Sequence, residues 1–160
     1  MKEKEDRWEK EKMSQKENSM YIKFMAIPEN ERLARMIAAA FLTSMNPTVE
    51  EMDDVKTAVS EAVTNCIIHA YDDMEKEELK QFEVEMILER KGQNCHISII
   101  DQGKGIKDVK QAMEPLYTTK SEEERSGMGF SFMEAFMNEL EVESEPGKGT
   151  KVCMMKRIGK

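Results

Sequence analysis

Long apolar runs, signal peptides and lipidation motifs are missing from this sequence of 160 residues. A membrane span needs about 20 consecutive apolar residues, so we expect no contact with a membrane. An excess of basic residues is also missing: 24 Lys and Arg stand against 32 Asp and Glu, giving a net charge of −8 that disfavours direct binding to nucleic acid. The three cysteines are far apart and form no Cys-x-x-Cys pair, as expected of reduced thiols in a cytoplasmic protein.

Residues 1–19 are poor in large apolar side chains. The first 18 residues carry six basic and six acidic side chains, and Trp8 is the only aromatic group before Met20. Such a segment cannot bury enough surface to offset the entropy of ordering it, so we expect disorder or a frayed helix, with a partner-binding tail as the alternative. Residues 20–160 are then long enough for one domain with a single core.

Apolar periodicity predicts an α+β domain from residue 20 onward. Helix one, over 29–44, is expected to bury Leu33, Met36, Ile37, Ala40 and Phe41. An acidic connection is expected over 72–80. This order favours a two-layer sandwich with a largely antiparallel sheet and helices on one face. The expected strands are 20–27, 81–90, 95–100, 140–144 and 150–156, and the expected helices are 29–44, 48–71, 107–114 and 128–138.

The helix over 48–71 carries a stripe of polar residues. Thr48 and Glu51 form a Thr-x-x-Glu capping box at its start. Thr57, Glu61, Asn65 and His69 follow at four-residue spacing, beside an apolar face. A carboxylate and a carboxamide one turn apart suit a cation or a proton to be moved, although one polar pair taken alone is more often a solvated helix face. Cys66 and His69 could be half of a zinc site, but no second pair completes it.

Two glycine clusters and a hydroxyl-rich loop follow this helix. An Asp-x-Gly-x-Gly motif at 101–105 ends a strand, where glycines permit close approach of a ligand, although Asp-x-Gly also makes ordinary turns. Residues 125–129 open a helix with Gly-Met-Gly, which suits a phosphate cradle supported by Arg125, or a simple helix cap. The loop at 115–120 could close over a ligand as a lid. Neither the Walker pattern nor Gly-x-Gly-x-x-Gly after a first strand is present, which excludes P-loop and Rossmann sites.

The joint order of these motifs resembles the GHKL superfamily of ATP-binding domains. Residues 61–65 resemble its N box, 101–105 its G1 box and 127–129 its G2 box. Within that superfamily, residues 59–71, 115–120 and 124–130 resemble the anti-sigma F factors, a family of serine kinases of endospore-forming bacteria. The resemblance covers about residues 20–157 and implies a GHKL (Bergerat) sandwich. Ala70 and Tyr117 depart from it, since glycine and phenylalanine are common there.

The resemblance implies a site for ATP and Mg²⁺. Asn65 would bind Mg²⁺, Asp101 the adenine amino group and Glu61 the proton of the substrate serine, as general base. Met128 is read as packing within the G2 box. Arg125 and Lys120 both stay candidates for the γ-phosphate. The implied nucleotide-binding residues are Asn65, Asp101, Gly103, Gly105, Thr118, Thr119, Lys120, Arg125, Gly127, Met128, Gly129 and Thr150.

The function implied by the resemblance is that of a cytoplasmic, homodimeric, ATP-dependent anti-sigma factor. It would inhibit a sporulation sigma factor and phosphorylate a serine of its anti-anti-sigma antagonist, with the exposed side of helix one as candidate partner surface. Two alternatives are an ATP-gated binding module without kinase activity and the catalytic domain of a histidine kinase. Glu61 argues against the first, and the absence of histidine in residues 1–19 argues against the second. Which sigma factor and which serine are involved stays open.

Overall fold

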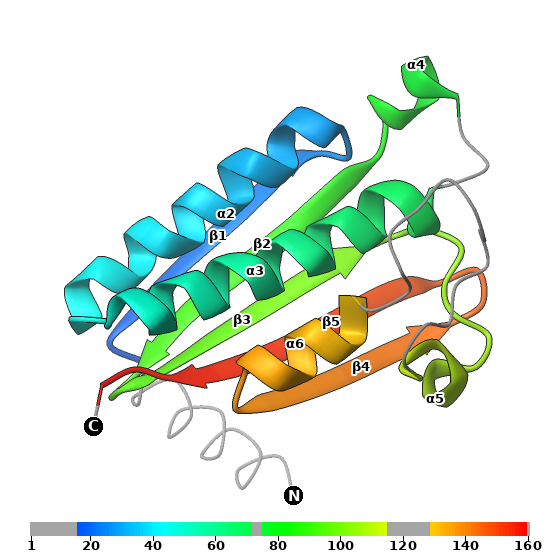
Figure 1. Cartoon of the computed structure of the whole chain (residues 1–160). Helices are drawn as coiled ribbons and strands as arrows, with labels where there is room; N and C mark the ends of the chain where they lie inside the picture. The colour runs from blue at the N-terminus through cyan, green and yellow to red at the C-terminus, as the bar shows by residue number, and fades with distance from the viewer. Residues whose placement is uncertain (1–15, 72–74, 115–128, 160) are drawn as a thin grey trace, which may run out of the picture.

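The chain forms an antiparallel sheet with helices on one face (Figure 1). This computed structural model describes residues 16–71, 75–114 and 129–159. Neighbouring strands all run antiparallel, in the order β1-β2-β3-β5-β4. The strands are β1 (Asn18–Met25), β2 (Glu83–Lys91), β3 (Asn94–Asp101), β4 (Glu139–Glu145) and β5 (Gly149–Arg157).

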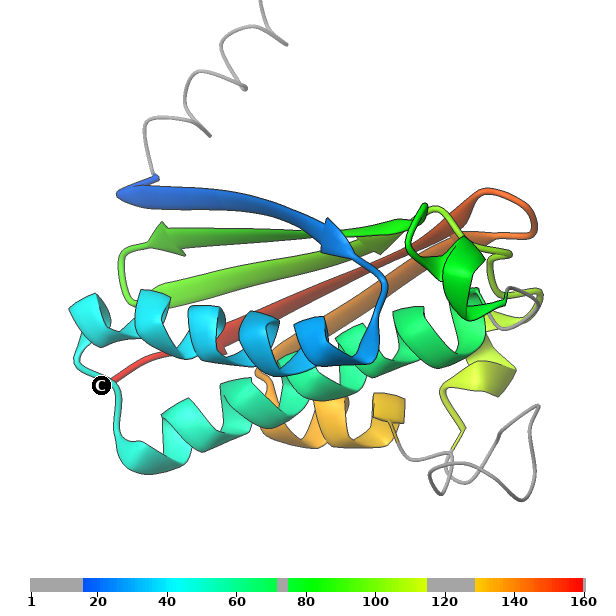
Figure 2. The ribbon, with the colours of Figure 1, turned by 90° about the horizontal axis from the view of Figure 1, so that it is seen from above.

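Three helices cover one face of the sheet: α2 (Pro28–Leu42), α3 (Val49–Asn65) and α6 (Gly129–Phe136). Figure 2 shows them as one layer beneath the sheet, and α3 lies between α2 and α6 and packs against both. Alternate residues of the strands point into this layer, so Val84, Met86 and Leu88 of β2 are fully buried. The predicted two-layer α+β sandwich is therefore confirmed. No helix of the described residues is long and apolar enough to cross a membrane.

The capping box predicted for α3 is present. The Thr48 side chain accepts a hydrogen bond from the Glu51 N–H at 3.1 Å, and the Glu51 carboxylate accepts one from the Thr48 N–H at 2.8 Å. The prediction of one continuous helix to residue 71 is wrong, because the last turn widens into a π-helix, η2 (Cys66–Ala70). In this conformation the Ala70 carbonyl accepts the Lys104 N–H at 3.0 Å, which joins the end of the helix to the loop after β3.

The predicted buried face of α2 is largely wrong. Leu33 and Met36 are 58 % and 56 % exposed, and Ala40 is exposed too. The buried residues are Ala34, Ala38, Ala39, Phe41 and Leu42. Small alanines let α2 lie close to α3, whereas periodicity alone favoured the larger side chains of the neighbouring stripe.

Several element boundaries differ from the prediction. β1 begins at Asn18 rather than Met20, so the strand starts inside the expected N-terminal extension, most of which lies outside the described residues. A short helix, α4 (Lys76–Leu79), occupies the expected connection. The helix expected over 107–114 is reduced to α5 (Val109–Ala112), capped by Asp108. A 3₁₀ turn, η1 (Thr43–Met45), follows α2.

Candidate nucleotide-binding site

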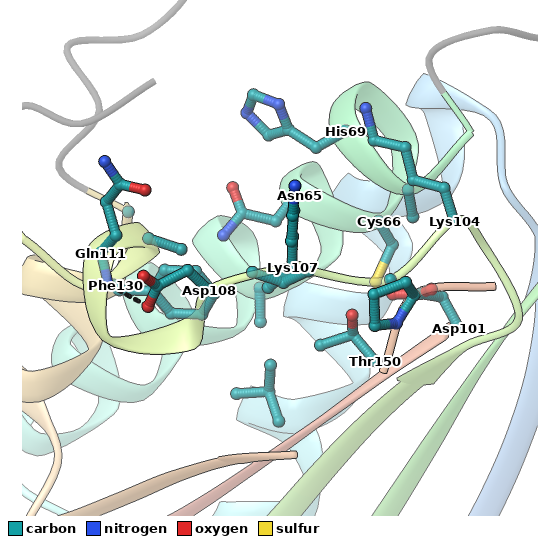
Figure 3. A pocket seen from close by; sticks show the side chains of 18 residues that line it. Asn65, Cys66, His69, Asp101, Lys104, Lys107, Asp108, Gln111, Phe130 and Thr150 are labelled. Atoms are coloured by element: carbon teal, nitrogen blue, oxygen red, sulfur yellow. Dashed lines mark hydrogen bonds between the residues drawn. The ribbon is translucent and has the colours of Figure 1, made fainter. Parts of the chain in front are cut away.

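A cavity of about 420 Å³ opens beside the C-terminal half of α3 (Figure 3). Its walls come from α3 and η2, the loop between β3 and α5, the first residues of α6, the β4–β5 turn and β5. These segments are far apart in the sequence, so the cavity exists only in the folded chain. Its lining residues are Ala62, Asn65, Cys66, His69, Ala70, Asp101, Lys104, Gly105, Ile106, Lys107, Asp108, Gln111, Ala112, Gly129, Phe130, Pro146, Thr150 and Val152.

Asn65 and Glu61 meet the start of α6. A Cβ on Gly129 would lie 3.3 Å from the side-chain oxygen of Asn65 and 3.3 Å from Oε2 of Glu61. The prediction that these side chains share one helix face is therefore confirmed, and Gly129 is the residue that leaves room for them. Asn65 lines the cavity. Glu61 is 9 % exposed and lies one turn behind Asn65, outside the cavity lining.

Asp101 lies at the end of β3 and is 5 % exposed. Its Oδ1 accepts the Gly103 N–H at 2.9 Å. Burial raises the pKa of the carboxyl group, while hydrogen bonds from the Gly103 N–H, the Cys66 thiol and the Thr150 N–H lower it. Asp101 pairs with Thr150 in the β3–β5 ladder, so the register of the sheet brings both to the cavity.

The Thr150 hydroxyl belongs to a small network of hydrogen bonds. Ser144 Oγ lies 2.8 Å from Thr150 Oγ1 and donates to the Gly149 carbonyl at 3.0 Å. The same Ser144 oxygen accepts the Ile106 N–H at 2.7 Å. Ser144 has one hydroxyl proton and donates it to the Gly149 carbonyl. The Thr150 hydroxyl therefore donates to Ser144, and the lone pairs of its oxygen are left to accept a hydrogen bond from another group.

The glycines of the 101–105 motif are required by contacts within the protein. A Cβ on Gly103 would overlap the Ala70 carbonyl, and a Cβ on Gly105, whose φ is +76°, would overlap the Glu145 carbonyl. The Lys104 carbonyl also accepts the Gly147 N–H at 2.7 Å. The loop is therefore held between η2 and the β4–β5 turn. Gly105 lines the cavity and Gly103 does not, so Gly103 acts through Asp101.

The predicted site residues fall into two groups. Asn65, Asp101, Gly105, Gly129 and Thr150 are brought together around the cavity. The remaining candidates in the lid loop and the G2 box lie outside the described residues: Thr118, Thr119, Lys120, Arg125, Gly127 and Met128.

Sequence reasoning missed several lining residues. Lys104, Lys107 and Asp108 follow the Asp-x-Gly-x-Gly motif, and their place in that loop was the available signal. His69 of the polar stripe lines the cavity, and so does Phe130, which directly follows the G2 glycines. Within the described ranges no group of three or more His, Cys, Asp or Glu side chains could hold a metal ion. A cation at this site would therefore depend on single oxygen ligands such as Asn65 and on oxygen atoms of the molecule that binds in the cavity.

The cavity can bind a molecule with two different ends. At one side, the buried Asp101 carboxylate offers hydrogen-bond acceptors to an amine, and at the other, the Asn65 carboxamide lies at the start of α6, where the helix dipole favours anions. This polarity suits a nucleotide, whose base carries donors and whose phosphates carry negative charge.

Comparison with known proteins supports the same interpretation. The family model for the histidine kinase-like ATPase domain matches residues 24–156. An anti-sigma F factor of Caldanaerobacter subterraneus subsp. tengcongensis is 54 % identical over 144 residues, which are 89 % of this chain and 96 % of that protein. An anti-sigma F factor of Clostridium beijerinckii is 51 % identical over 142 residues, with 89 % and 96 % covered.

Solved structures of low identity share the fold. The RsbU and RsbW domains of Rv1364c from Mycobacterium tuberculosis superpose with a TM-score of 0.64 at 19 % identity, over 89 % of this chain and 33 % of that one. The catalytic domain of histidine kinase ThkA gives a TM-score of 0.53 at 14 % identity, over 87 % and 96 %. The family match and the close relatives extend over nearly the whole described domain. The chain therefore belongs to the anti-sigma F factors, within the family of histidine kinase-like ATPase domains.

Proposed function

We propose that this chain is an ATP-dependent anti-sigma factor with serine kinase activity. It binds and inhibits a sporulation sigma factor, and it phosphorylates a serine of the anti-anti-sigma protein that opposes it. The observation that carries the proposal is that Glu61 and Asn65 both face Gly129, and that Asn65 and Gly129 line the same cavity as Asp101. The names of the relatives support a sigma factor as partner.

The nucleotide would lie with its base at Asp101 and its phosphates toward Asn65 and the start of α6. The Asp101 carboxylate would accept a hydrogen bond from the adenine amino group, and the N–H groups at the start of α6 would face the phosphates. Asn65 lines the cavity with a carbonyl oxygen, a ligand type that Mg²⁺ prefers, so Asn65 would hold this ion. When bound, Mg²⁺ would neutralise charge on the phosphates.

Glu61 is suited to act as general base. In the transfer step, the serine oxygen forms a bond to the γ-phosphorus, the bond from phosphorus to the ADP oxygen breaks, and Glu61 takes the serine proton. Most of the remaining acceleration comes from positioning and from charge stabilisation by fixed groups around the phosphates.

One observation favours a second candidate function, an ATP-gated sigma-binding module without kinase activity. Glu61 is buried and does not line the cavity, so its access to a substrate depends on how the antagonist docks. Mixing the purified chain with the anti-anti-sigma protein and γ-labelled ATP decides between the two. Labelled phosphoserine supports the kinase, and its absence alongside measured ATP binding supports the module.

Proteins that assemble with this chain have a candidate surface on α2. Leu33 and Met36 are large, apolar and exposed, and this supports the use of α2 as a contact surface in a homodimer. Sedimentation of the Leu33→Ser, Met36→Ser double variant is expected to show a weakened dimer, whereas Val49→Ser, also on an exposed position outside α2, leaves assembly unchanged.

A further inference from the structure

The loop between β3 and α5 uses several of its backbone N–H groups within the protein. These bonds run from Gln102 to the Tyr71 hydroxyl at 2.9 Å, from Gly103 to Asp101 Oδ1 at 2.9 Å, from Lys104 to the Ala70 carbonyl at 3.0 Å and from Ile106 to Ser144 Oγ at 2.7 Å. A donor that is already used is not available to an anion in the cavity. The loop therefore cannot cradle a phosphate with these amides, and a phosphate beside it would need side-chain partners.

The other donors at the cavity carry little charge. The start of α6 is equivalent to about half of an elementary positive charge, and the carboxamide of Asn65 is neutral. The phosphates of a nucleotide carry more negative charge than these groups balance. A full positive charge on the protein would therefore strengthen their binding.

Two lysines of the same loop, Lys104 and Lys107, line the cavity, and both are exposed. Figure 3 shows Lys104 on the side of the cavity where Asp101 lies. The side chain of Lys107 extends toward the side of Asn65. Of the two, Lys107 is thus the one directed to the part of the cavity where the phosphates are expected.

The backbone on both sides of Lys107 is fixed. Ile106 is held through its N–H by Ser144 Oγ at 2.7 Å. Asp108 caps α5, since its Oδ1 accepts the Gln111 N–H at 3.1 Å. The Lys107 side chain therefore projects from a point that the fold defines.

The Lys107 ammonium group is available to an anion. No carboxylate of the described residues lies within ion-pair distance of it, whereas Lys148 in the β4–β5 turn is paired with Glu145 at 3.0 Å. A lysine ammonium has three donors and binds phosphate as a point charge.

We propose that Lys107 binds the phosphate groups of the nucleotide through a charged contact of its Nζ, made from the loop between β3 and α5. The inference rests on the proposed function, which places the phosphates toward Asn65. It adds to that function a contact through which the nucleotide is held by its charge, from a loop whose amides are used elsewhere.

The first test measures the dissociation constant of ADP by calorimetry on the full chain, at constant Mg²⁺. Lys107→Met keeps a long apolar side chain and removes the charge. It is expected to weaken ADP binding about three- to tenfold, between the range of an exposed ion pair and that of a buried charged hydrogen bond. Lys107→Arg keeps the charge and is expected to stay within about twofold of the wild type.

Lys110→Met is the matched control. Lys110 is an exposed lysine of α5, three residues further along and outside the cavity lining, so its replacement changes the net charge equally. It is expected to leave the dissociation constant within about twofold. Unchanged binding in Lys107→Met, or an equal loss in Lys110→Met, would overturn the inference.

A second measurement separates a charged contact from packing of the lysine stem against the nucleotide. Raising the ionic strength from about 0.05 M to about 0.5 M screens exposed charges. The ratio of the Lys107→Met and wild-type dissociation constants is therefore expected to fall toward one. A ratio that does not change with salt, or an equal loss in Lys107→Arg and Lys107→Met, would overturn the charged contact.

The same measurements distinguish this inference from the proposed function. If the wild-type chain binds ADP and Lys107→Met binds it equally well, the role of Lys107 is wrong and the proposed function stands. If the wild-type chain binds neither ADP nor ATP, both are wrong.

Discussion

Two glutamates of α3 show how one helix serves two purposes. Glu51 lies in the first turn, where its carboxylate accepts the N–H groups of Thr48 and Gly159, both at 2.8 Å, and stabilises the fold. Glu61 lies in the second half, where Ser60, Glu61 and Thr64 are all buried. A polar residue at a helix start satisfies backbone groups that would otherwise lack partners, whereas a run of buried polar residues costs stability and indicates function.

Replacing the buried glutamate is expected to have the largest effect. Glu61→Gln should reduce phosphorylation of the antagonist by about 10²-fold or more while ATP binding is largely kept, because a carboxamide cannot accept the serine proton. Transfer of labelled phosphate and calorimetric binding of ATP would measure the two quantities. Glu51→Gln is the control, expected to leave transfer unchanged. Equal loss of ATP binding in Glu61→Gln and Asn65→Ala would mean that the division of roles is wrong.

The next largest effect is expected from a substitution where the end of η2 contacts the loop after β3. In Gly103→Ala, the new Cβ would overlap the Ala70 carbonyl and Cβ at the end of η2, and overpacking of this kind costs about 1–3 kcal/mol of stability. Urea unfolding would measure the loss. Gly92→Ala is a comparison with open space around the new Cβ, although its φ of +60° adds local strain. A smaller cost for Gly103→Ala than for Gly92→Ala would contradict the packing argument.

A substitution of Asn65, in the second half of α3, is expected to affect nucleotide binding and not proton transfer. Asn65→Ala should weaken nucleotide binding about tenfold in the presence of Mg²⁺, through loss of one ligand to a charged group. With the metal removed by chelation, the variant and the wild type should bind nucleotide with similar, weaker affinity. A tenfold difference that persists without Mg²⁺ would show that Asn65 contacts the nucleotide rather than the ion.

Replacing Glu51, in the first half of α3, is expected to have the smallest effect, a loss of stability that depends on pH. Hydrogen bonds from the Thr48 backbone lower the pKa of Glu51 in the folded state, and burial opposes this. Its stabilising effect is therefore present above the unfolded pKa and lost as pH falls through the folded pKa. Glu51→Ala should cost about 1 kcal/mol at neutral pH and progressively less in acid, as followed by urea unfolding. If the loss of stability does not change with pH, it comes from lost packing of the side chain and not from the charge of the carboxylate.

Local pattern was sufficient for most of the fold. Thr48 and Glu51 formed the predicted cap, and alternation placed Val84, Met86 and Leu88 on the buried face of β2. It failed on α2, where Leu33 and Met36 offered a plausible apolar stripe beside the alanines that are actually buried. Periodicity shows that a helix has an apolar side, but the fit between two helices decides which of two adjacent stripes is covered.

The sequence by itself determined the identities and order of the chemical groups: Glu61 and Asn65 one helical turn apart, Asp101 at a strand end and a glycine before Phe130. Those are properties of spacing along one chain. Only the tertiary structure decided what they face. The β3–β5 register placed Thr150 beside Asp101, the widened turn η2 brought Ala70 against the loop after β3, and α6 placed Gly129 against Glu61 and Asn65. Each of these contacts joins residues far apart in the sequence, so their cause is packing between elements, which no local pattern contains.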